Sequence, residues 1–498
     1  MFENTFWSLM PAVVAILLAL ITKEVYSSLF LGVVLGGLLY ANFSFIGTIN
    51  HVFNDGIVAS ISDSYNVGIL VFDVFLGALI ILMNRAGGSA AFGRWAKAHV
   101  KTKVGAQLAT IALGVLIFID DYFNCLTVGA VMRPLTDEHK ISRAKLAYLI
   151  DATAAPVCII APISSWAAAV TGFVEGANGF ELFLKAIPYN FYAILTIVMM
   201  LTLAFRNFDY GPMKVAEMSN HLNKTDDEIS EEKNVNMNGK VIHLVLPVLV
   251  LIAASIVGMI YTGGFFDGEN LVTAFSNADA SVGLMYGSAF ALVFTIIFFM
   301  ATKVLNFKDC MDCIPEGFKA MVPAIMILIL AWSLKGMTDS LGAKTYVAGL
   351  VENIAQNHAL MSLLPAFVFV IGCFLAFATG TSWGTFGILI PIIVAVFGGD
   401  MSNELMIIGI SACMAGAVCG DHCSPISDTT IMASAGAGDN HIEHVSTQLP
   451  YALTVAFISM ITYVVAGFCR AWYIALPFGI ILMIASLLFI QKITSAEK

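Results

Sequence analysis

Long runs of apolar residues, separated by short polar segments, follow one another along the whole chain. Each run is roughly seventeen to twenty-five residues long, the length of helix that spans a hydrocarbon core of about 30 Å. Two further apolar stretches, 103–133 and 361–397, are interrupted in the middle. The pattern predicts an all-α polytopic membrane protein with full spans at 6–22, 25–41, 67–84, 146–175, 183–205, 241–262, 280–302, 320–337, 405–435, 449–469 and 472–491.

Composition agrees with this interpretation and excludes several classes of protein. Only 12% of the 498 residues are charged and 59% are apolar, whereas about a quarter of a soluble protein is charged. The formal net charge of −10 argues against a polyanionic partner such as nucleic acid. Most of the nine cysteines lie inside apolar runs, so no disulfide framework is implied. A soluble enzyme, a nucleic-acid binder and a secreted disulfide scaffold are therefore excluded.

The placement of lysine and arginine predicts the topology. If both interrupted stretches are re-entrant hairpins, the N-terminus lies outside and the C-terminus lies in the cytoplasm. All but four of the 24 bases then fall on the cytoplasmic side, as the positive-inside rule requires. If 103–133 crosses the membrane fully, the excess of bases on the cytoplasmic side becomes smaller. In the hairpin topology no base is placed at the middle of the membrane. The four exceptions are Lys185, Lys335, Lys344 and Arg470.

This topology contains five crossings in the first half, and an odd number inverts the second half. We therefore predict two inverted-topology repeats, each with three spans, a re-entrant hairpin, a broken span and a further span. One extra C-terminal span follows. Such repeats with paired interruptions are the architecture of secondary transporters. The predicted parts are the first repeat at 1–206, a solvated cytoplasmic linker at 207–239, the second repeat at 240–470, and the extra span and tail at 471–498.

Two adjacent carboxylates, Asp120 and Asp121, lie at the middle of the first hairpin, followed by Asn124. A carboxylate at the bilayer centre costs roughly 2.5–3.5 kcal/mol on insertion scales, and neighbouring carboxylates repel. We expect these three residues to bind a cation or a proton. The alternative is that the aspartates only cap the broken helix ends.

The middle of the second hairpin has no charge but is rich in hydroxyl groups and glycine. Glycine lets the backbone unwind, and hydroxyl and carbonyl oxygens suit Na⁺, while half-helix N-termini suit an anionic group. A tight turn between packed helices is the alternative. We expect a substrate site formed by Thr379, Gly380, Thr381, Ser382, Trp383 and Thr385.

The densest polar cluster in the second half surrounds Pro425, which removes a backbone donor and breaks the span. His422 is suited to carrying protons near neutral pH. The alternative is the polar end of a span that faces water. The remaining oxygens are predicted cation ligands, from Asp421, Ser424, Asp428 and Thr429.

Three further groups of polar residues lie within or beside the apolar runs. Asp151 and Ser164 flank the partner break at Pro156, and we expect them to face the first hairpin tip and contribute to the substrate site. Asp73 is a lone carboxylate within a span, either proton-linked or a partner for a backbone gap. The His441-x-Glu443-His444 spacing resembles a metal or pH-sensing site, but in a short cytoplasmic loop it predicts solvated side chains.

Two motifs, Phe118-Ile-Asp-Asp-Tyr-Phe-Asn124 and Gly420-Asp-His-Cys-Ser-Pro-Ile-Ser-Asp-Thr-Thr430, resemble the NhaC family of sodium/proton antiporters, within the ion-transporter superfamily. The resemblance covers nearly the whole chain. It implies a bacterial inner-membrane secondary transporter whose hairpin tips and broken helices form the ion and substrate sites, and it makes a homodimer plausible. That family also includes malate–lactate exchangers and Na⁺-coupled amino-acid carriers.

The leading hypothesis is therefore a transporter rather than an enzyme, with Na⁺ as the coupling ion and no other cofactor, resembling a Na⁺/H⁺ antiporter. The runner-up is Na⁺-coupled transport of an amino acid or small organic acid, because a plain cation exchanger needs no hydroxyl-rich pocket with Trp383. A channel fits paired broken helices less well. An intramembrane aspartyl protease lacks its first glycine at Val418, and three consecutive residues at 421–423 cannot easily converge on zinc.

Overall fold

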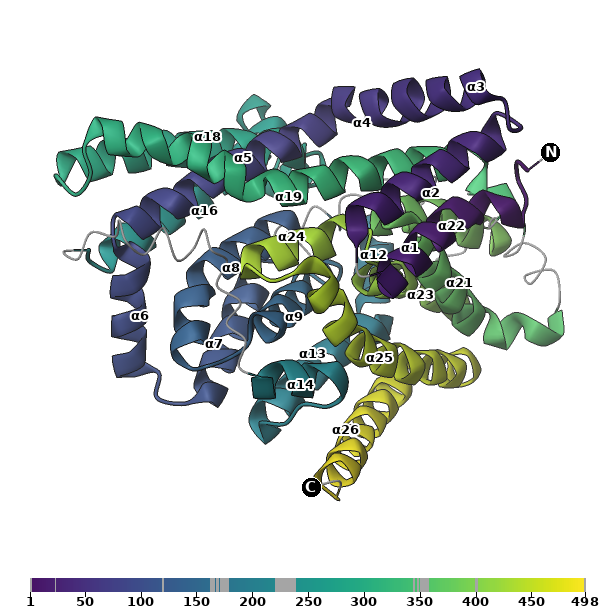
Figure 1. Cartoon of the computed structure of the whole chain (residues 1–498). Helices are drawn as coiled ribbons and strands as arrows, with labels where there is room; N and C mark the ends of the chain where they lie inside the picture. Colours follow the sequence, from purple (N-terminus) through teal and green to yellow (C-terminus); the bar gives the residue numbers. More distant parts are fainter. Residues whose placement is uncertain are drawn as a thin grey trace.

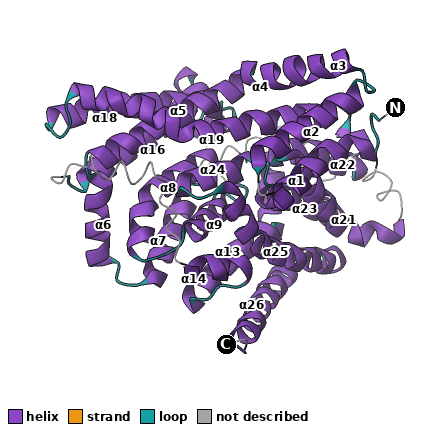
Figure 2. Ribbon diagram, viewed as in Figure 1, coloured by secondary structure: helices purple, strands orange, loops and turns teal. Residues whose placement is uncertain are grey.

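Almost every described residue of the chain is helical, and no strand occurs among them (Figure 2). The structure is a computed structural model. It describes residues 2–22, 24–118, 121–161, 166, 170, 179–219, 239–343, 345–346, 349, 358–398 and 402–496. Asp120, Ser164 and most of the predicted 207–239 linker lie outside the described residues.

One group of long helices forms the upper layer in Figure 1, where α5, α18 and α19 lie side by side. Helix α5 packs on both α18 and α19, α16 packs on α18, and α2 packs on α1 and α19. The bounds are α1 Met10–Thr22, α2 Val25–Tyr40, α5 Ser64–Arg85, α16 Ile242–Thr262, α18 Ala280–Ala301 and α19 Phe307–Ser340.

The second group contains both interrupted stretches and lies below that layer in Figure 1. Its first-half members are α7 Lys103–Leu116, α8 Asp121–Glu138, α9 Arg143–Thr153, α10 Ala155–Cys158, α12 Gly179–Ala186, α13 Phe191–Arg206 and α14 Gly211–Ser219. Its second-half members are α21 Leu364–Thr379, α22 Ser382–Val396, α23 Glu404–Cys423, α24 Asp428–Ala437, α25 His441–Cys469 and α26 Trp472–Ala496.

Shorter elements connect these helices. After α2 the chain runs through α3 Phe45–Asn50, a π-helical turn at His51–Val58 and α4 Ala59–Ser62 before α5 begins, and α6 Gly88–His99 joins α5 to α7. Helix α17 is Leu271–Ser276. The segment after α13 was expected to be solvated, but α14 buries Met213, and Glu217 of α14 forms an ion pair with Lys103.

Among the described residues, seven helices are long and apolar enough to cross a membrane, or nine if two bent pairs each form one span. The protein is therefore a multi-pass membrane protein. Eight of the eleven predicted spans are represented. The helices Phe6–Ala19 and Tyr26–Tyr40 are shorter than the roughly 20 residues that a span requires, and 146–175 is only partly described. One hairpin arm, Met361–Thr379, is long enough to span alone.

The predicted span 320–337 is only the second part of a 34-residue helix, α19. The helix bends by 44° between Phe307–Val322 and Ile325–Ser340. Pro323 occupies the bend, and a proline has no backbone N–H to donate to the hydrogen-bond ladder of the helix. The predicted span was too short because hydropathy identifies only the apolar part of a helix, and the first turns of α19 are polar.

The predicted interruptions are confirmed. Helices α7 and α8 are separated by a break before Asp121, and α21 and α22 by a break at Gly380, and the two members of each pair pack against one another. The third interruption, around Pro425, separates α23 from α24. Near Pro156 the helix also breaks, since α9 ends at Thr153 with Ala154 outside helical geometry.

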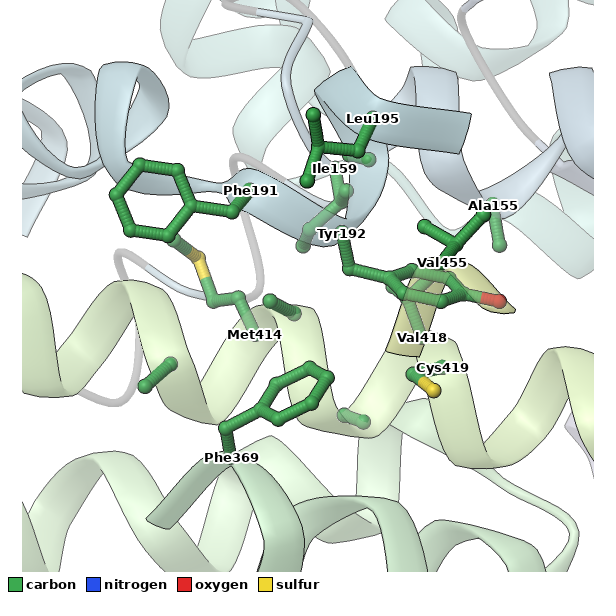
Figure 3. Close-up of a cluster of buried hydrophobic side chains, with 14 of the residues drawn as sticks. Ala155, Ile159, Phe191, Tyr192, Leu195, Phe369, Met414, Val418, Cys419 and Val455 are labelled. Carbon is green, nitrogen blue, oxygen red and sulfur yellow. The ribbon is translucent and has the colours of Figure 1, made fainter. Parts of the chain in front are cut away.

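Helix α23 is the centre of the second group, and every residue from Leu405 to Cys423 is buried. Lipid gives little hydrophobic drive for helix association, so close packing of small residues matters. A Cβ on Gly420 would lie 2.1 Å from the carbonyl oxygen of Cys373, so α21 and α23 touch backbone to backbone. Figure 3 shows the apolar cluster around this helix, in which α23 side chains meet Phe191, Tyr192 and Phe369.

Helices α8 and α24 approach equally closely. A Cβ on Gly129 would lie 2.3 Å from the carbonyl oxygen of Gly436, and a Cβ on Gly436 would lie 2.4 Å from that of Cys125. Real Cβ atoms do not approach backbone atoms this closely, and both neighbours are backbone rather than flexible side chain. This contact holds the middle of α8 against the last turn of α24.

Candidate functional site

A cavity of about 570 Å³ lies where the upper layer meets the interrupted helices. Volumes of several hundred Å³ are typical of small-molecule sites. The interrupted helices contribute Tyr122, Thr379, Gly380, Thr381, Trp383, Ile426 and Asp428 to its lining. The opposite wall is formed by α19 and the segments before and at the start of α5, with Asp55, Asp63, Tyr65, Asn66, Trp332, Lys335 and Asp339.

The tip of the second hairpin is a single left-handed residue, Gly380, at φ +65°. A Cβ at this position would be strained by the dihedral angle and would lie 2.5 Å from the carbonyl oxygen of Ile426. The tip therefore rests directly on the break between α23 and α24. Two hydrogen bonds reinforce this contact, because Ser382 Oγ donates to Asp421 Oδ2 at 2.7 Å and Ser424 Oγ donates to the carbonyl of Phe377 at 2.8 Å.

The break at Pro425 is organised by its own side chains. Ser427 accepts from the backbone N–H of Thr430 and so caps α24, while Asp428 Oδ1 accepts from the N–H of Thr429 at 2.9 Å. The other carboxylate oxygen, Asp428 Oδ2, accepts from Tyr122 Oη at 2.6 Å. The two interruptions that the sequence places 306 residues apart thus meet through this hydrogen bond.

Asn124 joins the broken ends of α7 and α9. Its Nδ2 donates to the carbonyls of Gly114 at 2.7 Å, Ile117 at 2.8 Å and Thr153 at 3.1 Å. Its Oδ1 is buried without a hydrogen bond among the described residues. The amide is therefore used for capping, and the oxygen is available as a ligand. Asp121 is buried at the first turn of α8.

The remaining predicted substrate residues divide into two sets. Thr379 and Thr381 line the cavity, but Thr385 Oγ1 donates within its own helix, to the carbonyl of Thr381 at 2.9 Å. Ser382 is buried and bonds to Asp421.

Asp73 lies within α5, 1% exposed, and neither of its carboxylate oxygens has a hydrogen bond among the described residues.

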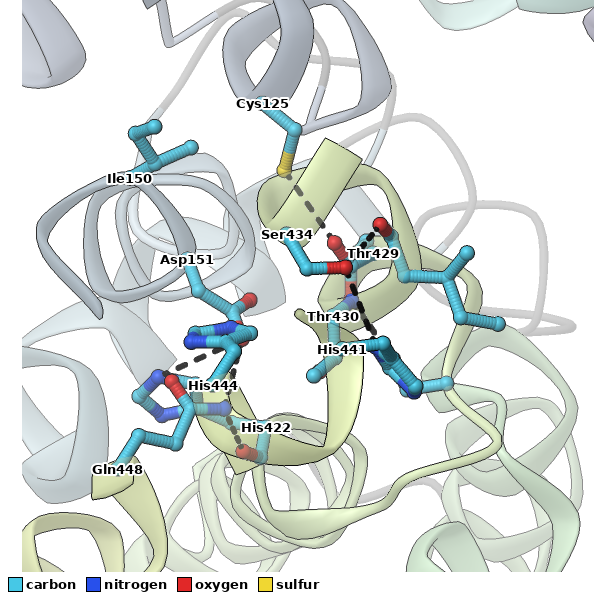
Figure 4. Close-up of polar contacts among 12 residues, drawn as sticks. Cys125, Ile150, Asp151, His422, Thr429, Thr430, Ser434, His441, His444 and Gln448 are labelled. Carbon is cyan, nitrogen blue, oxygen red and sulfur yellow. Dashed lines mark hydrogen bonds and ion pairs between the residues drawn. The ribbon is translucent and has the colours of Figure 1, made fainter. Parts of the chain in front are cut away.

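We expected Asp151 to face the first hairpin tip, but the described residue at the end of α9 that contacts Asn124 of the first hairpin is Thr153. Instead, Asp151 Oδ2 accepts from Gln448 Nε2 at 2.8 Å and lies 3.2 Å from His444 Nε2 and 3.9 Å from His422 Nε2 (Figure 4). His422 Nδ1 is 2.8 Å from Tyr192 Oη. This cluster lies in the core, where α25 packs on both α9 and α23. Its residues are not among the described residues that line the cavity.

The prediction of solvated histidines in the 436–448 segment was wrong. His444 is fully buried against Asp151, and His441 Nε2 lies 2.7 Å from the carbonyl of Pro425. His441 Nδ1 also lies 3.2 Å from Ser434 Oγ. The physical reason is that α25 begins at His441, so both histidines occupy the first helical turn, whose inner face packs on the break.

Lys335 is the clearest residue that sequence reasoning missed. It was assigned to the outer side with the other exceptions to the positive-inside pattern, but it lines the cavity within α19. Its charge interacts with that of Asp428. The available signal was a lone lysine inside a predicted apolar span, which is rare unless it serves a function.

Among the described residues, no group of three or more His, Cys, Asp or Glu side chains is arranged to hold a metal ion. A transition-metal site is therefore not indicated in that part of the chain. The oxygen atoms near the interruptions are a different donor set, and oxygen ligands suit hard cations. Asp421 Oδ1 and Asn124 Oδ1 are both buried and make no hydrogen bond to another described residue.

The chain is similar in sequence to several known proteins. An uncharacterized protein of Haemophilus influenzae is 38% identical over 484 residues, 94% of this chain and 92% of its own length. The malate-2H⁺/Na⁺-lactate antiporter of Bacillus subtilis is 29% identical over 167 residues, 33% of this chain and 34% of that one. The arginine/ornithine antiporter ArcD of Halobacterium salinarum is 28% identical over 193 residues, 38% of this chain and 37% of that one.

The Na⁺/H⁺ antiporter family matches residues 147–468, which include the second hairpin and the break at Pro425. The match covers more than half of the chain and includes the motif at 420–430, and the expected NhaC-type family is confirmed. The chain belongs to the Na⁺/H⁺ antiporter family.

Proposed function

We propose that the protein is a secondary active transporter that uses gradients of Na⁺ and H⁺ and works by alternating access. The observation that carries the proposal is the meeting of separate chain interruptions at one cavity, through the Tyr122–Asp428 and Ser382–Asp421 hydrogen bonds. Irregular backbone at membrane depth is tolerated only where it is buried in protein or lines a cavity. Transporters use such sites to bind their ions and substrates.

The coupling ion would bind among the oxygens at the interruptions. Asn124 Oδ1 and Asp421 Oδ1 are buried oxygens with no hydrogen bond to another described residue, and Asp121, Asp428, Ser424 and Thr429 lie on the adjoining turns. A buried carboxylate without a compensating partner is costly. Bound Na⁺ or a proton supplies that compensation, so the ion becomes part of the folded site.

Proton coupling has two candidate locations. Asp73 has no hydrogen bond among the described residues, so its charge needs a proton or a cation. His422 is in contact with Asp151 within a buried cluster. Both locations are distinct from the cavity lining.

The two halves support an inverted-repeat architecture in the bacterial inner membrane, with the N-terminus outside and the C-terminus in the cytoplasm. Each half contains a helical hairpin followed by a broken helix, α7–α8 with α9–α10 in the first half and α21–α22 with α23–α24 in the second. The proposed boundaries are 1–206 and 240–470. In this orientation the cavity opens to the outside, because Asp55 and Asp63 at its rim precede α5.

A second candidate is Na⁺-coupled transport of a small organic solute. The cavity of about 570 Å³ is far larger than a bare cation requires, and it is lined by aromatic side chains. Two relatives whose names give organic substrates are described as exchanging organic acids or amino acids, and each matches this chain over about a third of its length.

Proteoliposomes containing the full chain test the proposal. An imposed pH gradient or an added organic solute should drive Na⁺ movement, and Asp421→Asn should reduce it at least tenfold. The matched control is Asp312→Asn, at an exposed position near the start of α19. Absence of Na⁺ movement under every driving gradient in the wild-type protein would overturn the proposal.

A further inference from the structure

The cavity is lined by more acidic than basic side chains among the described residues. Of the described residues that line it, four are aspartates, Asp55, Asp63, Asp339 and Asp428, and one is a base, Lys335. Among the described residues, Lys335 Nζ forms no ion pair with any carboxylate. The charge of Lys335 interacts with Asp428 only beyond ion-pair distance, so its Nζ can also bind an anionic group that enters the cavity.

The surroundings of Lys335 suit a carboxylate. Its Cε lies 4.0 Å from the point where a Cβ on Gly384 would stand, so the side chain reaches from α19 to the first turn of α22. The start of that fifteen-residue helix presents backbone N–H groups and the positive end of its dipole. The cavity-lining Trp383 has a buried indole N–H with no acceptor among the described residues. Hydrogen-bond donors of the first turn of α22 and the positive charge of Lys335 thus belong to the same part of the cavity.

The other lining groups suit an ammonium. Asp428 accepts one hydrogen bond at each carboxylate oxygen and lines the cavity, and Asp339 lies one helical turn beyond Lys335. Tyr65, Tyr122 and Trp332 also line the cavity, and aromatic faces attract organic cations. A dicarboxylate would place its second charge against this acidic wall.

We propose that the cavity binds an α-amino acid, whose carboxylate is held by Lys335 and the first turn of α22 and whose amine faces Asp428. This inference rests on the proposed transport function and names its substrate class. It assigns substrate binding to α19, outside the interrupted helices. The size of the cavity leaves room for a side chain beside the aromatic residues.

Uptake into proteoliposomes gives the first test. Vesicles with an inward Na⁺ gradient are supplied in separate experiments with a mixture of radiolabelled L-amino acids, with labelled malate and with labelled lactate. The amino-acid mixture should accumulate, Lys335→Gln should lower accumulation at least tenfold, and Lys335→Arg should retain part of it. Lys308→Gln, at an exposed position near the other end of α19, should leave it unchanged.

A competition experiment separates carboxylate binding from simple neutralisation of Asp428. For the amino acid that accumulates, its methyl ester lacks the negative charge and should compete poorly with the wild-type protein. In Lys335→Gln this discrimination should disappear, whereas a lysine that only neutralises Asp428 would leave it intact. Intact discrimination in that variant, accumulation of malate or lactate alone, or no accumulation of any label would overturn the inference.

The same vesicles distinguish this failure from failure of the proposed function. If a pH gradient moves Na⁺ but no amino acid accumulates, the substrate class is wrong and Na⁺/H⁺ coupling stands. If an amino acid accumulates without any need for Na⁺, the substrate class stands and Na⁺ coupling is wrong.

Discussion

Lys145 is the largest charged side chain that is fully buried, and one residue in a loop makes its burial tolerable. Its Nζ lies 2.5 Å from Asp209 Oδ1, which also accepts from Tyr451 Oη at 2.5 Å. Burial alone would raise the pKa of Asp209, but the charge of Lys145 and these hydrogen bonds hold it below its ordinary value. Stability from this pair is therefore present above the ordinary carboxyl pKa and is lost in acid.

We predict that Asp209→Asn destabilises the protein by about 3–5 kcal/mol, because removing one partner of a buried pair leaves the other charge uncompensated. Thermal unfolding of the purified protein in detergent should show a clear fall in Tm at neutral pH. Asp312→Asn removes an exposed carboxylate and should leave the Tm unchanged. Equal melting temperatures for the two variants would show that Asp209 does not stabilise Lys145.

Asp439 lies in the turn between α24 and α25. Its pKa predicts a dependence of stability on pH that has the opposite sign. Burial and the nearby Glu443 raise its pKa to about 8, against the influence of Arg143. The folded state then keeps a proton that the unfolded chain loses near the ordinary carboxyl pKa of about 3.9. Stability falls as pH rises between these two values and levels off above the higher one.

Asp439→Asn removes this titration. The Tm of the variant relative to the wild type should rise steadily from about pH 4 to about pH 8, the window set by the two pKa values. The measurement is the same thermal unfolding at a series of pH values. A constant difference between the two proteins across that series would contradict the prediction.

Backbone contact between helices is the feature that matters most at the scale of elements. Helices α8 and α24 meet through Gly129 and Gly436, and this contact aligns Tyr122 with Asp428. A methyl group at either glycine must push the helices apart, because the atoms it meets are backbone. Transport should therefore be more sensitive to these glycines than their distance from the cavity suggests.

We predict that Gly436→Ala lowers Na⁺-coupled transport at least tenfold while the protein still inserts in the membrane. The control is Gly349→Ala, where a Cβ meets nothing within 4 Å. Transport is measured in proteoliposomes with matched amounts of protein. Wild-type rates in the Gly436 variant would show that the spacing of α8 and α24 is not critical.

The interruptions could be predicted from the sequence because glycine, proline and adjacent carboxylates within apolar runs have local physical consequences. The contacts of Asp151 could not, because its partners His444 and Gln448 lie 293 and 297 residues away. The role of Lys335 was missed for a related reason. Counting the bases on each side of the membrane assigns a lysine to one side. It does not predict which residues of other helices that lysine contacts.

At the scale of the whole molecule, the predicted orientation can be tested by cysteine labelling. Gly239 is unsuitable, since a Cβ there would lie 2.3 Å from the carbonyl oxygen of Gly87. Ser219 and Glu269 are both exposed. Ser219 is the last residue of α14, before the polar segment and α16, and Glu269 follows α16 in the chain. An impermeant maleimide added outside intact cells should label Glu269→Cys, whereas Ser219→Cys should react only after the membrane is permeabilised.

The wild-type protein provides the background, because its nine cysteines are buried or half-buried. Labelling of both variants from outside, or of Ser219→Cys alone, would contradict the predicted orientation. It would also place the cavity rim at Asp55 and Asp63 on the cytoplasmic side.

The support of the second hairpin tip has a mechanical consequence. Gly380 rests on the carbonyl of Ile426, Ser382 is bonded to Asp421, and Ser424 is bonded to the backbone at Phe377. The tip cannot lift away from the break without losing all three contacts together, so the two interruptions form a single moving part. The cavity must then widen or narrow where this part faces α19. A solute held between Lys335 and Asp428 would bridge that seam and pull it shut.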